Sequence, residues 1–268
     1  TQDREGVLDA AGRVTSALGD ASAGVPGDGL GAEIVDEAYR QLTAAFDPVH
    51  GGFGSAPKFP SAHNLTFLLR YGHLRDDPRA RAMADKTLRA MAAGGMYDHV
   101  GFGFHRYATD ARWLVPHFEK MLYDQATLAL AYTEAYQATG DAQHARVAGE
   151  ILEYVLRDMT SPKGGFYSAE DADSEGVEGK FYVWTADEVE EVLGAERAAP
   201  FLAAYDVTAA GNYHDEATGE ATGTSIPHLR EPLDDATREA LAPLRAELFA
   251  AREARVHQPV AEVEQLAG

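Results

Sequence analysis

Three glycine pairs divide this chain into pairs of helices. They are Gly51-Gly52, Gly94-Gly95 and Gly164-Gly165, and each is followed by an aromatic residue or Met. Two amphipathic segments separate each pair from the next, with Pro78 or Gly140 at the boundary between them. A two-helix unit that recurs in this way predicts stacked helical hairpins, in which each hairpin buries the face that its neighbour leaves open. An open α-solenoid and a closed α/α toroid both satisfy the pattern.

The apolar periodicity predicts helices over much of the chain. The expected helices are 7–18, 34–46, 65–74, 78–93, 116–139 and 142–158, then one that begins at the Thr185 and Glu188 capping box, and one from Asp234 or Asp235 through Leu248. Two short strands, 166–167 and 181–184, are expected on either side of an acidic loop at 170–176, as a small β-hairpin insertion near 164–184. Residues 206–234 are expected to form a long loop. We therefore predict an N-terminal helix and linker over 1–30 and an all-α domain over 31–268.

The charge of the chain limits its partners. The formal net charge is -20, from 43 acidic residues against 23 Lys and Arg, which argues against a nucleic-acid partner and against an anionic membrane surface. No apolar run approaches the roughly 20 residues of a membrane span, and no signal peptide is expected at the start, so we predict a cytoplasmic protein without membrane contact. The absence of cysteine excludes disulfides, thiolate nucleophiles and Cys-ligated zinc in this stretch.

Between the second and third glycine pairs lies a run that is rich in His, acidic, Arg and aromatic residues. Sugars need aromatic platforms for their apolar faces, and sugar chemistry needs carboxylates or His for proton transfer. The residues expected to transfer protons are His105, His117, Glu119, Glu170, Asp171 and Asp173. Those expected to contact substrate are Asp98, Arg106, Trp113, Tyr123, Phe53 and Trp184. The alternative is that the aromatic residues pack the hairpin ends and the charged residues are solvated.

A metal site is not expected. His99, His105 and His117 have ligand chemistry, but no two of them stand at the helical spacing of three or four residues that metal-binding helices use. The acidic loop begins like a calcium loop at Asp171, but Tyr182 occupies the twelfth position, where a bidentate Glu is required. The residues imply no cofactor.

Four ordered blocks of sequence resemble a known family. They are GGFGSAPKFP (51–60), GFGFHRY (101–107), WLVPHFEKMLYD (113–124) and YSAEDADSEG (167–176). The blocks are similar to those of the thioredoxin-domain-containing family related to the spermatogenesis-associated thioredoxin-like protein, over about residues 31–255. The resemblance implies an α/α toroid like that of six-hairpin glycosidases and N-acylglucosamine 2-epimerase, preceded in that family by a thioredoxin-like domain.

The chain departs from the family pattern in two respects. It carries no thioredoxin-like domain and no cysteine pair, and it has fewer predicted helices than a closed ring of six hairpins needs. We therefore expect a partial toroid, completed by further chain or by a second copy. Two functions follow as hypotheses: binding or processing of a small carbohydrate by His and carboxylate acid-base chemistry, or non-catalytic docking of a thioredoxin-like domain or a client protein.

Overall fold

The computed structural model describes residues 4–22, 31–214 and 219–262. Contacts divide the chain into two units, 1–37 and 38–268. In the first unit, α1 (Arg4–Ser22) contains the helix predicted around 7–18, and its residues are exposed almost throughout. The linker predicted at 23–30 lies outside the described residues. The predicted domain boundary after residue 30 stays a prediction.

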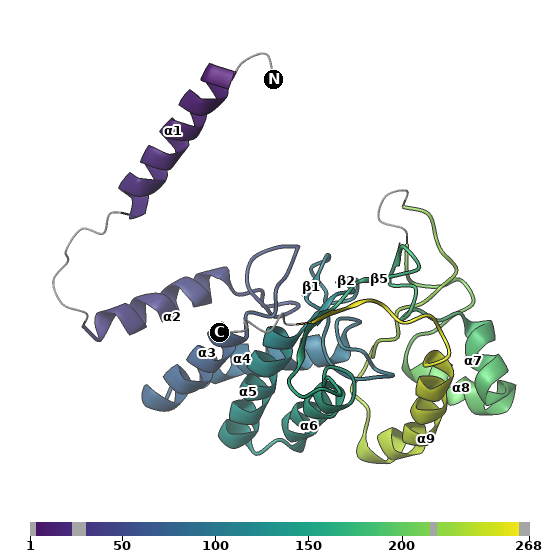
Figure 1. Cartoon of the computed structure of the whole chain (residues 1–268). Helices are drawn as coiled ribbons and strands as arrows, with labels where there is room; N and C mark the ends of the chain where they lie inside the picture. Colours follow the sequence, from purple (N-terminus) through teal and green to yellow (C-terminus); the bar gives the residue numbers. More distant parts are fainter. Residues whose placement is uncertain (1–3, 23–30, 215–218, 263–268) are drawn as a thin grey trace. The chain divides into compact units, whose positions relative to one another are not determined.

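The rest of the chain is mainly helical, as predicted. Its helices are α2 (Glu33–Ala45), α3 (Ala62–Leu74), α4 (Pro78–Ala93), α5 (Leu122–Thr139), α6 (Ala142–Arg157), α7 (Ala186–Leu193), α8 (Ala195–Ala204) and α9 (Asp235–Arg252). Helices α3 and α4 form one hairpin and α5 and α6 the next, and α3 packs against α5, so that the hairpins stand side by side (Figure 1). This is the arrangement of part of an α/α toroid, and the fold class predicted from the sequence is confirmed.

Local sequence explains the short turns within the hairpins. The Asp77 carboxylate caps α4 by accepting hydrogen bonds from the backbone N–H groups of Arg79 and Ala80. Gly140 ends α5 in the left-handed region, with φ of 71°, and the Asp141 carboxylate then caps α6. These short turns leave the long connections between hairpins at the opposite end of the helices.

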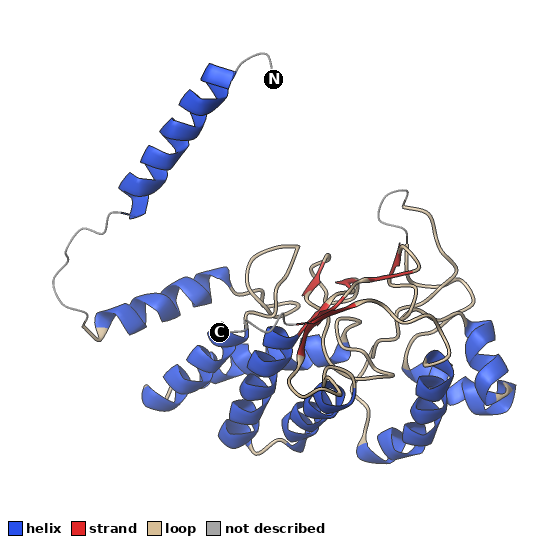
Figure 2. Ribbon diagram, in the orientation of Figure 1, coloured by secondary structure: helices blue, strands red, loops and turns tan. Residues whose placement is uncertain are grey.

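That opposite end carries the strands (Figure 2). They are β1 (Tyr107–Ala108), β2 (Pro116–His117), β3 (Lys120–Met121), β4 (Tyr167–Glu170), β5 (Asp173–Ser174), β6 (Val177–Glu178) and β7 (Val260–Glu262). The strand pairs are β1 with β2 and β5 with β6, while β4 lies between β3 and β7, all antiparallel. The site described below is built on this end.

The helix predicted to begin at Pro116 is wrong in its first turns. Residues 116–121 instead enter two ladders, His117 opposite Tyr107 and Lys120 opposite Glu170, and α5 begins only at Leu122. The ladders bury Phe118 and Lys120, which a helix from residue 116 would not place in these pairings.

Of the two strands predicted at 166–167 and 181–184, the first is present as β4, which begins at Tyr167 and extends to Glu170, whereas the second needs correction. A hairpin forms at the end of the acidic loop and directly after it, where β5 and β6 are joined by Glu175 and Gly176, both with positive φ (54° and 74°), as a two-residue hairpin turn requires. Residues 181–184 form no strand. Trp184 forms an isolated antiparallel bridge with Ser225, and Phe181, Tyr182 and Trp184 are all buried, so their aromatic character reflects packing in the core.

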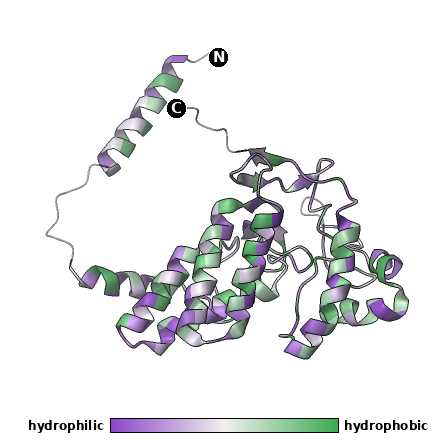
Figure 3. Ribbon diagram, turned by 60° about the horizontal axis from the view of Figure 1, so that its bottom comes forward, coloured by the Kyte–Doolittle hydropathy of each residue, from purple (hydrophilic) through white to green (hydrophobic). Residues whose placement is uncertain are grey.

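The second glycine pair is required by close backbone contact. A Cβ on Gly94 would lie 2.2 Å from the carbonyl oxygen of Trp113, and one on Gly95 would lie 2.2 Å from that of Leu114. The loop before β2 therefore rests directly on the end of α4. Hydrophobic and hydrophilic residues alternate along the helices (Figure 3), and the fully buried hydrophobic residues include Leu65, Leu88 and Ile151. None of the helices in the described ranges has the length and hydropathy to cross a bilayer.

Candidate functional site

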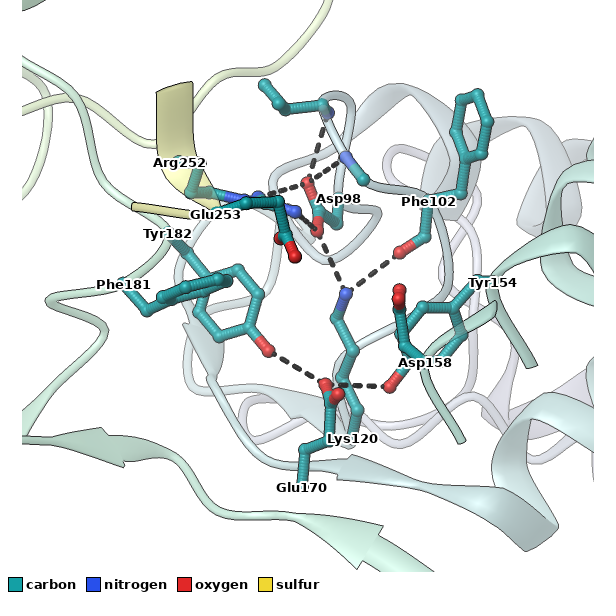
Figure 4. Close-up of polar contacts among 12 residues, drawn as sticks. Asp98, Phe102, Lys120, Tyr154, Asp158, Glu170, Phe181, Tyr182, Arg252 and Glu253 are labelled. Carbon is teal, nitrogen blue, oxygen red and sulfur yellow. Dashed lines mark hydrogen bonds and ion pairs between the residues drawn. The ribbon is translucent and has the colours of Figure 1, made fainter. Parts of the chain in front are cut away.

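A cavity of about 340 Å³ lies where the ends of α6 and α9 meet β3, β4 and β7. Charged and aromatic side chains line it, among them Lys120, Tyr154, Glu170, Tyr182 and Arg252 (Figure 4). These residues come from four separate elements and from the loop before α7. The cavity is therefore a product of the tertiary fold.

A buried ion cluster forms the inner wall of the cavity. Lys120 Nζ lies 2.9 Å from Asp98 Oδ2, and the Arg252 guanidinium binds both oxygens of the same carboxylate at 2.9 Å each. Asp98 Oδ1 also accepts hydrogen bonds from the backbone N–H groups of Val100 and Gly101. Lys120 Nζ donates further to the carbonyl oxygen of Phe102, at 2.8 Å. One buried carboxylate thus compensates two buried cations, as buried charges require.

Burial and pairing act against each other on these groups. Burial alone would raise the pKa of Asp98, but Arg252 and Lys120 outweigh it and hold that pKa well below the usual range. Burial lowers the pKa of Lys120, and the nearby carboxylates of Asp98 and Glu170 offset part of this effect. The ammonium also lies over two aromatic rings, 4.3 Å from the centre of Tyr154 and 4.8 Å from that of Tyr182.

Glu170 faces this cluster across the cavity. Its Oε2 accepts hydrogen bonds from the hydroxyls of Tyr154 at 2.8 Å and Tyr182 at 3.2 Å, which approach it from two sides (Figure 4). Burial raises the pKa of both tyrosines well above 10, so they remain neutral donors. Gln258 donates in turn to the Tyr182 hydroxyl. Because both tyrosines use the same oxygen, neither of them engages Oε1.

The outer part of the cavity is aromatic and charged. Phe181 and Phe249 line it beside the Arg252 guanidinium, which lies 5.0 Å and 5.7 Å from the two ring centres. Glu253 and His257 stand at the rim, with 3.7 Å between His257 Nε2 and Glu253 Oε2. The cavity therefore offers flat apolar faces together with hydrogen-bonding groups of both signs.

The structure places one of the sequence-predicted site residues, Glu170, in the lining of this cavity. Asp98 lies behind the wall, 7% exposed and paired with Lys120 and Arg252, so the predicted contact with substrate does not fit its position. His105 lies behind its wall, not in it: the side chain is 2% exposed, its ring meets Tyr182 edge-on, and Nδ1 contacts the Phe118 carbonyl. Burial, together with the nearby Lys120 ammonium, lowers the pKa of His105 to about 3. His105 is thus a neutral packing residue, and the predicted proton-transfer role does not fit its position.

A second group of predicted residues gathers on the β1–β2 hairpin. Arg106 Nη1 donates to Glu119 Oε2 at 2.8 Å, and His117 Nδ1 lies 2.8 Å from Glu178 Oε1. His117 Nε2 is 3.8 Å from the same Glu119 carboxylate, and Tyr123 is half exposed. None of these residues lines the cavity, because Glu119 and Lys120 are adjacent on the chain and their side chains take opposite sides.

The remaining predicted residues lie elsewhere. Trp113 is fully buried and donates its indole N–H to the His50 carbonyl, while Trp184 is buried beneath the Arg255 guanidinium. Phe53 packs against Phe46. These three aromatic residues serve packing, so the predicted substrate contacts do not fit their positions.

The acidic pair of the loop is also separate from the cavity. Asp171 is exposed and its Oδ1 accepts the backbone N–H of Asp173, which begins β5. Across the described ranges, no three His, Cys, Asp or Glu side chains are arranged to hold a metal ion.

Sequence reasoning missed the residues that complete the cavity. Lys120 and Tyr182 lie within the regions singled out from the sequence, but a buried lysine has no local signal that separates it from a solvated one. Arg252 has no local signal in the sequence, because its partner Asp98 lies 154 residues away. Helix α9, which carries Arg252, was predicted only from its leucines. Tyr154 lies on the buried face of α6 and looked like an ordinary core residue.

Comparison with known proteins confirms the resemblance seen in the sequence. The chain is 43% identical over 258 residues to human spermatogenesis-associated protein 20, covering 87% of this chain and 33% of that protein. Its identity to the rat protein of the same name is 39% over 298 residues, covering 98% of this chain and 37% of that protein. The chain thus spans about a third of the length of the curated relatives it matches. No family model matches the chain.

Among solved structures, the chain is similar to two sugar-active enzymes. One is cellobiose 2-epimerase from Bacillus thermoamylovorans B4167, with a TM-score of 0.46, 14% identity, and 63% of this chain and 50% of that chain covered. The other is a family 76 glycoside hydrolase from a bovine Bacteroides thetaiotaomicron strain, with a TM-score of 0.45, 12% identity, and 82% and 50% covered.

Proposed function

We propose that the cavity binds a small neutral carbohydrate and that Glu170 transfers protons to or from it. The observation that carries the proposal is the position of the Glu170 carboxylate, held by two tyrosine hydroxyls inside a cavity with aromatic walls. Aromatic rings bind the apolar faces of sugars, and charged groups bind their hydroxyls. A carboxylate in hydrogen-bonding reach of such a ligand can act as a general acid or base.

The charges of the cavity favour a neutral ligand. Its lining carries Lys120, Arg157 and Arg252 and an equal number of carboxylates, from Asp158, Glu170 and Glu253. Lys120 and Arg252 are already paired with Asp98, so no cation in the inner wall is left to bind a uronic acid. A sugar with only hydroxyl groups matches this balance.

Calorimetric titration with a panel of neutral mono- and disaccharides tests the binding. We expect millimolar or tighter affinity for at least one sugar, and at least a tenfold loss in Glu170→Gln. Glu134→Gln is the matched control, because Glu134 pairs with Arg70 on an exposed surface away from the cavity. No binding at millimolar sugar, or equal loss in both variants, contradicts the proposal.

Solvent deuterium exchange tests the chemistry. If Glu170 removes a proton from carbon next to the carbonyl of an open-chain sugar, incubation in D₂O puts deuterium at that carbon, and NMR detects it. Glu170→Gln abolishes the exchange, and Glu134→Gln leaves it unchanged. Binding without exchange in the wild-type protein limits the site to recognition.

A second candidate function is docking. Leu152 and Leu156 stand one turn apart on α6 and are 52% and 67% exposed, which is unusual for leucines on the helix of a packed hairpin. A thioredoxin-like domain or a further hairpin of the toroid is the partner that the resemblance suggests for them. Sedimentation equilibrium of the Leu152→Gln/Leu156→Gln variant, with and without a thioredoxin-like domain, tests this docking. If the substitutions leave association unchanged, docking on this face is contradicted.

A further inference from the structure

Two arginines pair with a single carboxylate between α6 and α9, away from the residues that line the cavity, and a third arginine lies on the same face of α9. Arg146 and Glu150 lie one turn apart on α6, and Arg146 Nη1 donates to Glu150 Oε2 at 2.6 Å. Arg245, on α9, has Nη1 3.9 Å from Glu150 Oε1. Arg238 lies two turns before Arg245 on the same face of α9. We call Arg146, Arg238 and Arg245 the arginine cradle.

The charge of the cradle is not balanced locally. Arg146 and Arg245 share Glu150, and the Tyr97 hydroxyl also donates to that carboxylate, while Arg238 donates through Nη2 to the Leu233 carbonyl oxygen. Arg238 has one further acidic neighbour, Asp235, whose Oδ1 is 3.9 Å from Arg238 Nε and whose side chain is fully exposed. The cradle therefore sets three guanidinium groups against two carboxylates, one of them fully exposed, in a chain whose net charge is -20.

The cradle is also short of hydrogen bonds. The side chains of Arg146, Arg238 and Arg245 are only 27%, 18% and 13% exposed. The Nε atoms of Arg238 and Arg245 are buried and have no hydrogen-bond partner. Burying a guanidinium N–H without an acceptor costs free energy, so an arrangement with two such groups favours any ligand that supplies the acceptors.

Like-charge repulsion adds to this cost. Burial lowers the pKa of Arg238, and the nearby Arg146 guanidinium lowers it further. Burial also raises the pKa of Tyr97 well above 10, so its hydroxyl stays a neutral donor beside the arginines. An anion placed among the three guanidinium groups would remove the repulsion.

We infer that the arginine cradle binds a phosphate group. A phosphate anion is opposite in charge to this positive excess, and its oxygens can accept several hydrogen bonds from arginine forks at once. The limited exposure of the three side chains favours a small anion over an acidic protein surface. The phosphate can be inorganic phosphate or the phosphomonoester of a small metabolite. The inference is independent of the sugar site, because no residue of the cradle lines that cavity.

Calorimetric titration at constant ionic strength tests the inference, with inorganic phosphate, glucose 6-phosphate and glucose as probes. We expect phosphate to bind and Arg245→Gln to weaken it at least tenfold. Arg245→Lys keeps the charge but loses the fork, so it is expected to fold and to bind at an intermediate affinity. Arg197→Gln is the matched control, because Arg197 pairs with Glu247 on the exposed side of α9.

The outcomes separate the sources of the phosphate. Tighter binding of glucose 6-phosphate than of inorganic phosphate supports a metabolite, and the reverse supports the free ion. Glu170→Gln is expected to leave phosphate binding unchanged, so that failure here is distinct from failure of the sugar site. The inference is overturned if neither phosphate compound binds, or if Arg197→Gln weakens binding as much as Arg245→Gln does.

Discussion

Lys120 Nζ lies 2.9 Å from Asp98 Oδ2, and this contact joins the first residue of β3 to the loop that follows the second glycine pair. Arg252 at the end of α9 closes the cluster on the same carboxylate. The Asp98 carboxylate thus connects β3 to the end of α9. The inner wall of the cavity depends on it.

Asp98→Asn is expected to be strongly destabilising. It leaves Lys120 and Arg252 buried without a countercharge, and removing one partner from a buried ion pair costs about 3–5 kcal/mol. Lys120→Met is expected to cost less, because Asp98 keeps Arg252 and the Met side chain fills most of the volume of the lysine stem. Urea denaturation of both variants measures the difference. Equal losses would show that Arg252 alone does not compensate Asp98.

Gly94→Ala is expected to destabilise the fold by more than about 2 kcal/mol, because the new Cβ would overlap the Trp113 carbonyl oxygen and force the backbone apart. Gly149→Ala is the control with the opposite sign. Gly149 lies inside α6 with open space around it, so alanine there should stabilise by about 0.5–1 kcal/mol. Thermal unfolding of the two variants decides the matter. Tolerance of alanine at residue 94 would disprove the close approach.

The contrast between these glycines shows what the sequence could predict. The glycine pairs, the boundary residues Pro78 and Gly140, the Thr185 capping box and the apolar periodicity are local signals, and the helices they predicted are present. The helix predicted from Pro116 was wrong in its first turns and begins at Leu122, because pairing of Lys120 with Glu170 is a contact between distant segments that overrides local propensity.

The site was predictable only in part, for the same reason. Glu170 was found because it lies in a motif dense in acidic and aromatic residues. Asp98, His105 and Trp113 lie in such motifs too, but all three are buried outside the lining of the cavity. A residue type shows what chemistry is available, whereas the distinction between a cavity and a core depends on which distant elements cover it.

The free energy of unfolding is expected to fall as pH rises from about 4 to 7. The cause is one carboxyl group, that of Asp124. Burial raises its pKa from 3.8 to about 7, with Glu119 adding to the rise and Arg106 opposing it. The folded state therefore holds a proton that the unfolded state has lost in this interval, and the cost is present in full above pH 7. Asp124→Asn should remove it.

After allowance for partial solvent exposure, we expect Asp124→Asn to stabilise by on the order of 1–2 kcal/mol at pH 8 and to have little effect near pH 4. Urea denaturation at the two pH values measures this. Asp235→Asn, which changes a fully exposed carboxylate, is the control. A gain in Asp124→Asn that is independent of pH would exclude titration of Asp124 as its cause.

Arg255 is expected to hold the aromatic wall of the cavity in place. Its Nη1 donates to the carbonyl oxygens of Phe181 and Val183, both at 2.8 Å, and its guanidinium lies 4.0 Å from the ring centre of Trp184. Arg255→Lys keeps the charge but cannot bridge both carbonyls in the same planar geometry. We expect the segment 181–184 to loosen, with a loss of about 1–2 kcal/mol of stability.

Tryptophan fluorescence reports on this change directly, because the chain has 2 Trp residues and the other, Trp113, is fully buried away from Arg255. We expect a red shift in Arg255→Lys as Trp184 gains contact with water, together with weaker sugar binding, since Phe181 and Tyr182 lie in the displaced segment. Lys180→Gln alters an exposed pair with Glu175 beside the same segment and should change neither. Loosening of the segment with full sugar affinity would show that the wall formed by Phe181 and Tyr182 does not contact the ligand.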